Sequence, residues 1–139
     1  MKEKGTEPID VLFVCVGNAA RSQMAEGFLR QLGGDHFQAS SAGMMPHWWV
    51  DPQTVEVMKE VGVDISGQRP KGLDAVDVMN QDVIVTMGCP DNACPRVPGA
   101  ERWEWRLEDP HDKPLEVYRA VRDEIRWRVA GLVEELSRE

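Results

Sequence analysis

The chain has 139 residues, of which 42% are hydrophobic, and its formal net charge is −8 at pH 7. A chain of this size can bury one core, and it has no repeat or long linker, so we expect a single domain over residues 1–139. The acidic balance argues against nucleic acid as a partner, because binding to phosphate backbones requires clustered Lys and Arg side chains.

The N-terminal residues and the cysteine count indicate a cellular compartment. Residues 1–6 are charged and lack the apolar core of a signal peptide, and no run approaches the length of a transmembrane helix. Three cysteines are an odd number and too few for a disulfide framework. We therefore expect a cytoplasmic protein with no membrane partner, reactive thiols and a flexible tail over residues 1–7.

Extended and helical hydrophobic patterns alternate along the chain. The predicted strands cover residues 11–14, 36–41, 82–87 and 102–107. The predicted helices cover residues 23–30, 52–61 and 114–137, with a short helical piece at 73–76. This alternation favours an α/β fold in three layers, a doubly wound sheet of about four parallel strands, with ligand-binding residues at the carboxyl ends of the strands.

The first strand leads into a tight turn that begins at Cys15 and feeds the first helix. Backbone N–H groups converge in such a turn, and the helix dipole adds partial positive charge, so an anion can bind there. Arg21 supplies a planar guanidinium that matches two oxygens of a tetrahedral oxyanion. The Cys15 thiolate would then face the centre of the anion, although a buried structural thiol is the alternative. The predicted oxyanion-binding residues are Val16, Gly17, Asn18, Ala19, Ala20 and Arg21.

Two polar residues can support the thiolate. Ser22 can donate a hydrogen bond to Cys15, although it could also be a simple first-turn serine. Asn18 is expected to adopt a left-handed conformation and brace the loop.

The residues from Cys15 to Glu26 resemble a family signature. Their Cys-x5-Arg-Ser pattern is similar to that of low-molecular-weight tyrosine phosphatases and of the arsenate reductases that share their fold. The longer pattern Cys-x-Gly-Asn-x-x-Arg-Ser-Gln-Met-Ala-Glu resembles the reductase branch more closely. Many relatives carry a second cysteine before the arginine, where this chain has Ala20, so no redox pair can form inside the loop.

The other two cysteines, Cys89 and Cys94, follow the central strand on the edge of the sheet that carries Cys15. Taken alone, they could be packed loop thiols, half of a zinc site or members of a thiol relay. We expect no metal ion and no cofactor, because no Cys or His pair completes four ligands and the three histidines show no ligand pattern.

The resemblance implies that the thiols reduce arsenate to arsenite, a reaction of arsenical resistance. Cys15 attacks arsenic, a second thiolate attacks the Cys15 sulfur and releases arsenite, and a third thiol exchanges into the disulfide. Cys89 is implied to act before Cys94. Cys94 matches the reductases, whereas Cys89 lies one position late, which leaves the order open. The implied partners are arsenate and thioredoxin or a similar redox protein, and we expect a monomer.

Asp109 precedes a proline and is the candidate general acid, because a leaving hydroxide needs a proton. The resemblance points to the same Asp-Pro pair, and a plain turn residue is the alternative. The residues after it, His111 to Lys113, lack the aromatic side chains with which many phosphatases of this fold bind a phenyl ring. This segment favours a small inorganic substrate.

The resemblance also raises a potassium site. In some relatives an Asn, a Glu and a Ser help to hold the ion, and Asn18, Glu26 and Ser41 match them. The remaining contributors fall near residues 69–71, where Arg and Lys make a second cation unfavourable.

Two other functions stay open, and so does the role of Trp48 and Trp49. A phosphatase would use Cys89 and Cys94 only to protect Cys15 from oxidation, and a binding module would sequester arsenite on the three thiolates.

Adjacent tryptophans cannot face one side of a strand, so at least one is expected at the surface, either as packing, as a pocket rim or as a docking patch.

Overall fold

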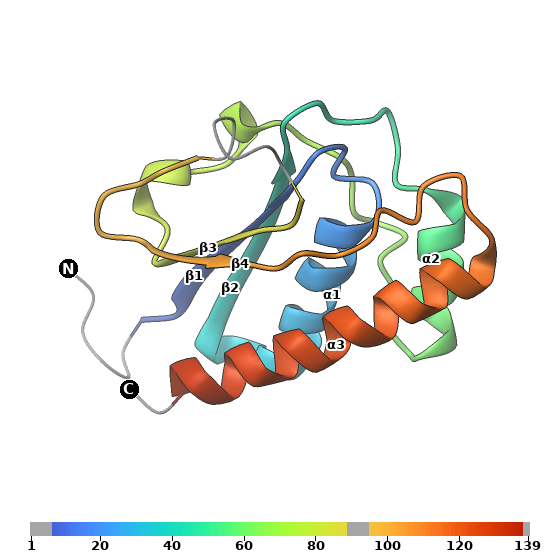
Figure 1. Ribbon diagram of the computed structural model, residues 1–139. Coiled ribbons are helices and arrows are strands. Elements are labelled where there is room, and N and C mark those ends of the chain that lie inside the picture. Colours follow the sequence, from blue (N-terminus) through green and yellow to red (C-terminus); the bar gives the residue numbers. More distant parts are fainter. Residues whose placement is uncertain (1–6, 89–94, 138–139) are drawn as a thin grey trace.

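The computed structural model describes residues 7–88 and 95–137 (Figure 1). Strands and helices alternate as predicted, and each predicted element is present. They are β1 (Ile9–Cys15), α1 (Arg21–Gly33), β2 (Phe37–Gly43), α2 (Pro52–Glu60), β3 (Val83–Thr86), β4 (Glu101–Glu104) and α3 (Leu115–Ser137). Short 3₁₀ turns cover Gly34–His36, Leu73–Ala75 and Val78–Asn80.

The four strands form one parallel sheet in the order β2-β1-β3-β4, which confirms the predicted fold class. Strand β1 is central, and its residue Val14 pairs with Ala42 on one side and with Thr86 on the other. Because both faces are covered, residues 11–15 are buried without polar interruption. The carboxyl ends of β1 and β3 therefore lie side by side, which brings Cys15 close to the residues after Thr86.

The two faces of the sheet are covered differently. Val11, Phe13 and Cys15 face a large core made with α1, α2 and α3, which lie together on one side of the sheet (Figure 1). Leu12, Val14 and Ile84 face a smaller core, closed by apolar residues from the 3₁₀ turns and from residues 97–100. Successive side chains of β1 thus point alternately into the two cores.

Strand β4 is shorter than predicted, because it ends at Glu104 rather than at residue 107. It is an edge strand that pairs only with β3, and the pairing stops where β3 stops, at Thr86. The amide of Trp105 still donates to Thr86 O, and its indole packs against Phe13 with ring centroids 5.9 Å apart. The apolar pattern of the sequence therefore continues past the end of β4, because Trp105 still packs in the core.

Three predictions fall on residues outside the described part. The tail over residues 1–7 is described only at Glu7, and Cys89 and Cys94 lie between the two described ranges. Within the described ranges, no helix is long and apolar enough to cross a membrane.

Candidate active site

The loop after Cys15 is held from behind by a second segment of the chain. The amides of Met44, Met45, His47 and Asp51 donate to the carbonyls of Cys15, Val16, Gly17 and Ala19, at 2.8 to 3.1 Å. In a planar trans peptide the N–H points away from the C=O of the same unit. With these carbonyls bound to residues 44–51, the loop amides are directed to the opposite side, where an anion can accept from them.

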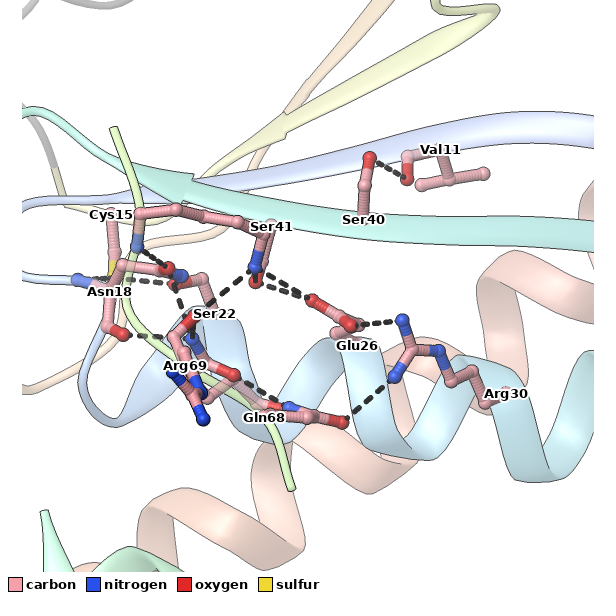
Figure 2. Close-up of polar contacts among 12 residues, drawn as sticks. Val11, Cys15, Asn18, Ser22, Glu26, Arg30, Ser40, Ser41, Gln68 and Arg69 are labelled. Atoms are coloured by element: carbon pink, nitrogen blue, oxygen red, sulfur yellow. Dashed lines mark hydrogen bonds and ion pairs between the residues drawn. The ribbon is translucent and has the colours of Figure 1, made fainter. Parts of the chain in front are cut away.

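The thiol itself lies in a buried hydrogen-bond network (Figure 2). Asn18 Nδ2 donates to Ser22 Oγ at 2.7 Å, and Ser22 Oγ lies 2.8 Å from Cys15 Sγ. Because the Ser22 oxygen already accepts this bond, its own proton is free to point at the sulfur. The backbone amide of Asn18 also donates to Cys15 Sγ, at 3.3 Å. The sulfur therefore lies within hydrogen-bond distance of two polar groups behind the cavity.

Asn18 has the left-handed conformation that the sequence predicts, with φ at 51°. Its side chain is locked from two more directions, because Oδ1 accepts from Gln23 Nε2 at 3.0 Å and from the amide of Lys71 at 2.9 Å. The sequence analysis did not single out Gln23 or Lys71. Gln23 stands in the Gln-Met-Ala-Glu run next to Ser22, and this run was the signal that could have identified it.

Arg21 brings the other predicted site residues together. Its guanidinium is almost completely buried, donates to Leu107 O at 3.3 Å and lies 3.5 Å from the Asp109 carboxylate. Gly88 also lies against the Arg21 guanidinium. It has a φ of 90°, and a Cβ at this position would collide with Arg21 Nη1. Arg21 thus contacts the segment that enters the Cys89 loop as well as the candidate acid.

Cys15, Arg21 and Asp109 line one cavity of about 60 Å³, and residues 16, 17, 19 and 20 of the loop line it too. The structure therefore gathers the predicted oxyanion-binding residues around a single space, with Asn18 and Ser22 behind the thiol. The Asp109 carboxylate is about half exposed, so it can exchange protons with solvent.

His47, Asp51 and His111 complete the rim of this cavity, and sequence analysis missed all three. His47 covers the loop so closely that a Cβ on Gly17 would lie 2.6 Å from its Nε2. The two imidazole rings meet edge to face with centroids 4.9 Å apart. His47 and Asp51 come from the segment 44–51 and His111 from a distant one, so only the fold reveals that the three lie together.

The buried carboxylate of Asp51 organises the rim. Its Oδ2 lies 3.0 Å from His111 Nδ1 and accepts a hydrogen bond from the hydroxyl of Tyr118, also at 3.0 Å. The hydrogen bond with Asp51 raises the pKa of His111 above its usual value. Burial and the same carboxylate raise the pKa of Tyr118, so its hydroxyl stays a donor.

The residues that match a potassium site hold an ammonium group instead. Ser41 donates to the buried Glu26 carboxylate, which also pairs with Arg30 (Figure 2). Lys71 Nζ lies 3.7 Å from Glu26 Oε1, 3.5 Å from Ser41 Oγ and 3.3 Å from the Arg69 carbonyl. Two cations already neutralise Glu26, so these residues do not fit a potassium ion.

Comparisons with known proteins agree on one family. Residues 10–139 match the family model of the low molecular weight phosphotyrosine protein phosphatase. A glutaredoxin arsenate reductase of Synechocystis sp. is 40% identical over 129 residues, which cover 91% of this chain and 98% of the relative.

Two solved structures are similar in fold as well as in sequence. An arsenate reductase in the phosphate binding state is 37% identical with a TM-score of 0.84, and the match covers 91% of this chain and 98% of that one. A thioredoxin-dependent arsenate reductase of Corynebacterium glutamicum is 33% identical with a TM-score of 0.81, over 96% of this chain and 64% of that one.

Proposed function

The chain belongs to the low molecular weight phosphotyrosine protein phosphatase family, and we propose that it reduces arsenate to arsenite in arsenic detoxification. The relatives named arsenate reductases support this assignment, because they match over most of both chains.

The single observation that carries the proposal is the buried thiol beside a small anion cavity. Cys15 Sγ receives hydrogen bonds from Ser22 and Asn18, and Arg21 lines the same space of about 60 Å³. The cavity is small and is lined by the oxyanion loop and Arg21, so it suits a tetrahedral oxyanion. A held anion and an aligned thiolate remove most of the entropic barrier to attack.

In the first step, the Cys15 thiolate attacks arsenic and forms a sulfur–arsenic bond. One hydroxyl group leaves arsenic, and Asp109 donates the proton that makes it water. Asp109 is suited to this role because it lies 3.5 Å from Arg21, which would bind the neighbouring oxygens. The guanidinium and the loop amides stabilise the negative charge on those oxygens during the attack.

In the second step, we propose that Cys89 forms a disulfide with Cys15. The Cys89 thiolate attacks the Cys15 sulfur, the sulfur–arsenic bond breaks, and its electron pair stays on arsenic, which leaves as arsenite. Cys94 then displaces Cys15 from the disulfide and carries the oxidised pair to the donor. Gly88 supports this order, since it lies against Arg21 and is directly followed by Cys89.

A dithiol protein of the thioredoxin class is the proposed reductant. Similar proteins differ in the redox protein that their names give, since one is named for glutaredoxin and another is described as thioredoxin-dependent. The relay ends in a disulfide within one short loop, which a thioredoxin-type protein can reduce by direct exchange. We also propose that the protein is a monomer in the cytoplasm, where its thiols stay reduced.

The test follows arsenate-dependent NADPH oxidation with thioredoxin and its reductase, and separately with glutaredoxin, glutathione and glutathione reductase. Wild type is expected to turn over continuously with thioredoxin, whereas Cys89→Ser and Cys94→Ser stop after at most one equivalent of arsenite. Cys15→Ser defines the background. Continuous turnover in both single variants would overturn the relay, and turnover only with glutaredoxin would overturn the choice of donor.

The description of the family itself favours one second candidate, a phosphatase. Phosphate ester hydrolysis needs Cys15, Arg21 and Asp109 but no second thiol, because water completes the cycle. Hydrolysis of an aryl phosphate that Cys89→Ser and Cys94→Ser leave unchanged, without arsenate turnover in wild type, would assign the chain to the phosphatases.

A further inference from the structure

We infer that the rim of the cavity is a binding site for a divalent zinc-class ion, formed by His47, Asp51 and His111. Each residue offers one ligand atom, and these atoms all lie within 4.8 Å of one another. Zinc accepts both imidazole nitrogens and carboxylate oxygens, whereas magnesium and calcium prefer ligand sets made of oxygen alone. The sequence predicts no metal ion, so this site departs from that expectation.

The pair formed by His111 and Asp51 already has the spacing of two ligands on one ion. Their nearest atoms, Nδ1 and Oδ2, are 3.0 Å apart. Ligands about 2.0 to 2.1 Å from a tetrahedral zinc ion lie roughly 3.3 Å from each other. The ion can therefore take the place of the proton between the two groups with a shift of a few tenths of an ångström, and that proton passes to water.

The groups around the pair are those that usually orient zinc ligands. Tyr118, which is 1% exposed, donates its hydroxyl to Asp51 Oδ2 and fixes the carboxylate. On the other side of the imidazole, His111 Nε2 lies 3.5 Å from the carboxylate of Asp112. Once the ion holds Nδ1, the ring proton stays on Nε2, and the Asp112 carboxylate is near enough to attract it.

His47 supplies the third ligand and has the freedom to adjust. Its amide donates to Gly17 O at 2.9 Å, which fixes the backbone, while the residue is exposed at the surface. Rotation about its side-chain bonds moves the ring nitrogen by about an ångström and brings it into coordination. Water fills a fourth position.

The charges facing the cavity permit a cation. Asp51 and Asp109 line the cavity, the opposing charge of Arg21 is paired with Asp109, and Asp112 adds a further negative charge beside His111. Because Cys15 and the oxyanion loop line the same cavity, an ion on this rim lies across the entrance to the thiol. Zinc is therefore expected to shield Cys15, which is a property separate from arsenate turnover.

The direct test is zinc binding to the full-length chain with all three cysteines changed to serine, measured by competition with a chromophoric chelator. We expect one zinc ion per chain, and we expect His47→Ala and His111→Ala each to weaken binding by more than tenfold. Asp112→Asn is expected to weaken it about tenfold, as outer partners of zinc ligands do. His36→Ala is the matched control, because His36 is an exposed histidine in the turn after α1.

Nitrogen-15 spectra of the imidazoles give a readout that does not depend on the stability of any variant. Zinc should shift the ring resonances of His47 and His111 and leave those of His36 unchanged. Equal weakening by His36→Ala, or unshifted His47 and His111 resonances at a zinc concentration that saturates the chain, would overturn the site.

Protection of the thiol provides a second arm. In the Cys89→Ser/Cys94→Ser variant only Cys15 remains, and zinc should slow its alkylation by iodoacetamide at least tenfold until a chelator is added. The same protection after addition of His47→Ala and His111→Ala to this variant would mean that the thiol binds zinc without the rim. That result would also contradict the inference.

Discussion

Cys15 forms the floor of the cavity, and the completely buried Asn18 and Ser22 behind it hold its sulfur through contacts of 2.8 and 3.3 Å. At the rim, the side chains of His111 and Asp109 are 43% and 55% exposed, and one buried carboxylate, Asp51, fixes the imidazole. Floor and rim line the same cavity, yet the side chains of the floor have almost no conformational freedom, whereas those of the rim have much.

This contrast separates two tasks that the site must perform. A buried, fully bonded floor holds the sulfur and the oxyanion loop in one geometry, so no reorganisation is needed during attack. An exposed rim can change its contacts at little cost in stability, because its side chains are screened by water. We therefore expect floor substitutions to affect chemistry or folding strongly, and rim substitutions to affect titration and binding.

The largest effect is expected when the floor loses its planar cation. Arg21→Lys keeps a positive charge but cannot bind two oxygens at once, so kcat/KM for arsenate should fall by about 10³-fold. The matched control is Arg106→Lys, whose guanidinium is exposed. A loss below about threefold in the steady-state assay would show that Arg21 does not bind the anion.

Asn18→Ala should reduce the free energy of unfolding by about 3 kcal/mol, because it leaves buried partners without hydrogen bonds and places alanine at a positive φ. Urea unfolding followed by circular dichroism measures this change. Asn80→Ala removes an exposed asparagine whose side chain bonds to the Asp77 carboxylate and serves as the control, with an expected loss below about 0.5 kcal/mol. Equal losses in the two variants would contradict the bracing role of Asn18.

On the rim, Asp109→Asn removes the proposed proton donor and should lower kcat by about 10²-fold, with no change in the unfolding free energy above about 0.5 kcal/mol. The limb of the pH–rate profile on which activity falls as pH rises should change as well, because a proton donor must be protonated to act and asparagine has no such proton to lose. Asp35→Asn, an exposed carboxylate next to α1, is the control. An unchanged profile in Asp109→Asn would assign the acid to another group.

A smaller effect is expected from His111, whose pKa is raised by Asp51. The stabilisation from the charged pair should be complete below about pH 6.5 and should be lost as pH rises through the raised pKa. Since the ring is 43% exposed, we expect the stability difference between wild type and His111→Gln to shrink by less than about 1 kcal/mol between pH 5.5 and 9. Denaturation with EDTA present measures it, and a difference that grows with pH would contradict the pairing.

The smallest effect is expected at Trp48, which is 93% exposed. Trp48→Ser should change the unfolding free energy by less than about 0.5 kcal/mol, whereas Trp105→Ser, a tryptophan packed on Phe13, should cost about 3 kcal/mol or more. Thermal unfolding of both variants side by side checks the difference. A comparable loss at Trp48 would mean that this indole is packed rather than exposed.

The sequence was sufficient for the residues that follow a local rule. Cys15 and Arg21 were predicted because a buried strand, a turn and a helix follow one another within a few residues, whereas Asp109 was predicted from the need for a proton donor and from the family resemblance. The end of β4 was not predicted, since it depends on the length of its partner strand. Asp51 and His111 were not predicted either, because they meet only after α3 has packed against α2 and placed Tyr118 beside both.

The hydrogen bonds between residues 44–51 and the carbonyls behind Cys15 have a consequence for how this chain can change in evolution. The amides of Met44, Met45, His47 and Asp51 are each tied to a fixed partner in the loop. An insertion or deletion within residues 44–47 would shift these pairings and deform the anion cradle. Trp48 and Trp49 stand between the last two tied amides and are exposed, so among the described residues of this segment they are the place where its length can vary between lineages.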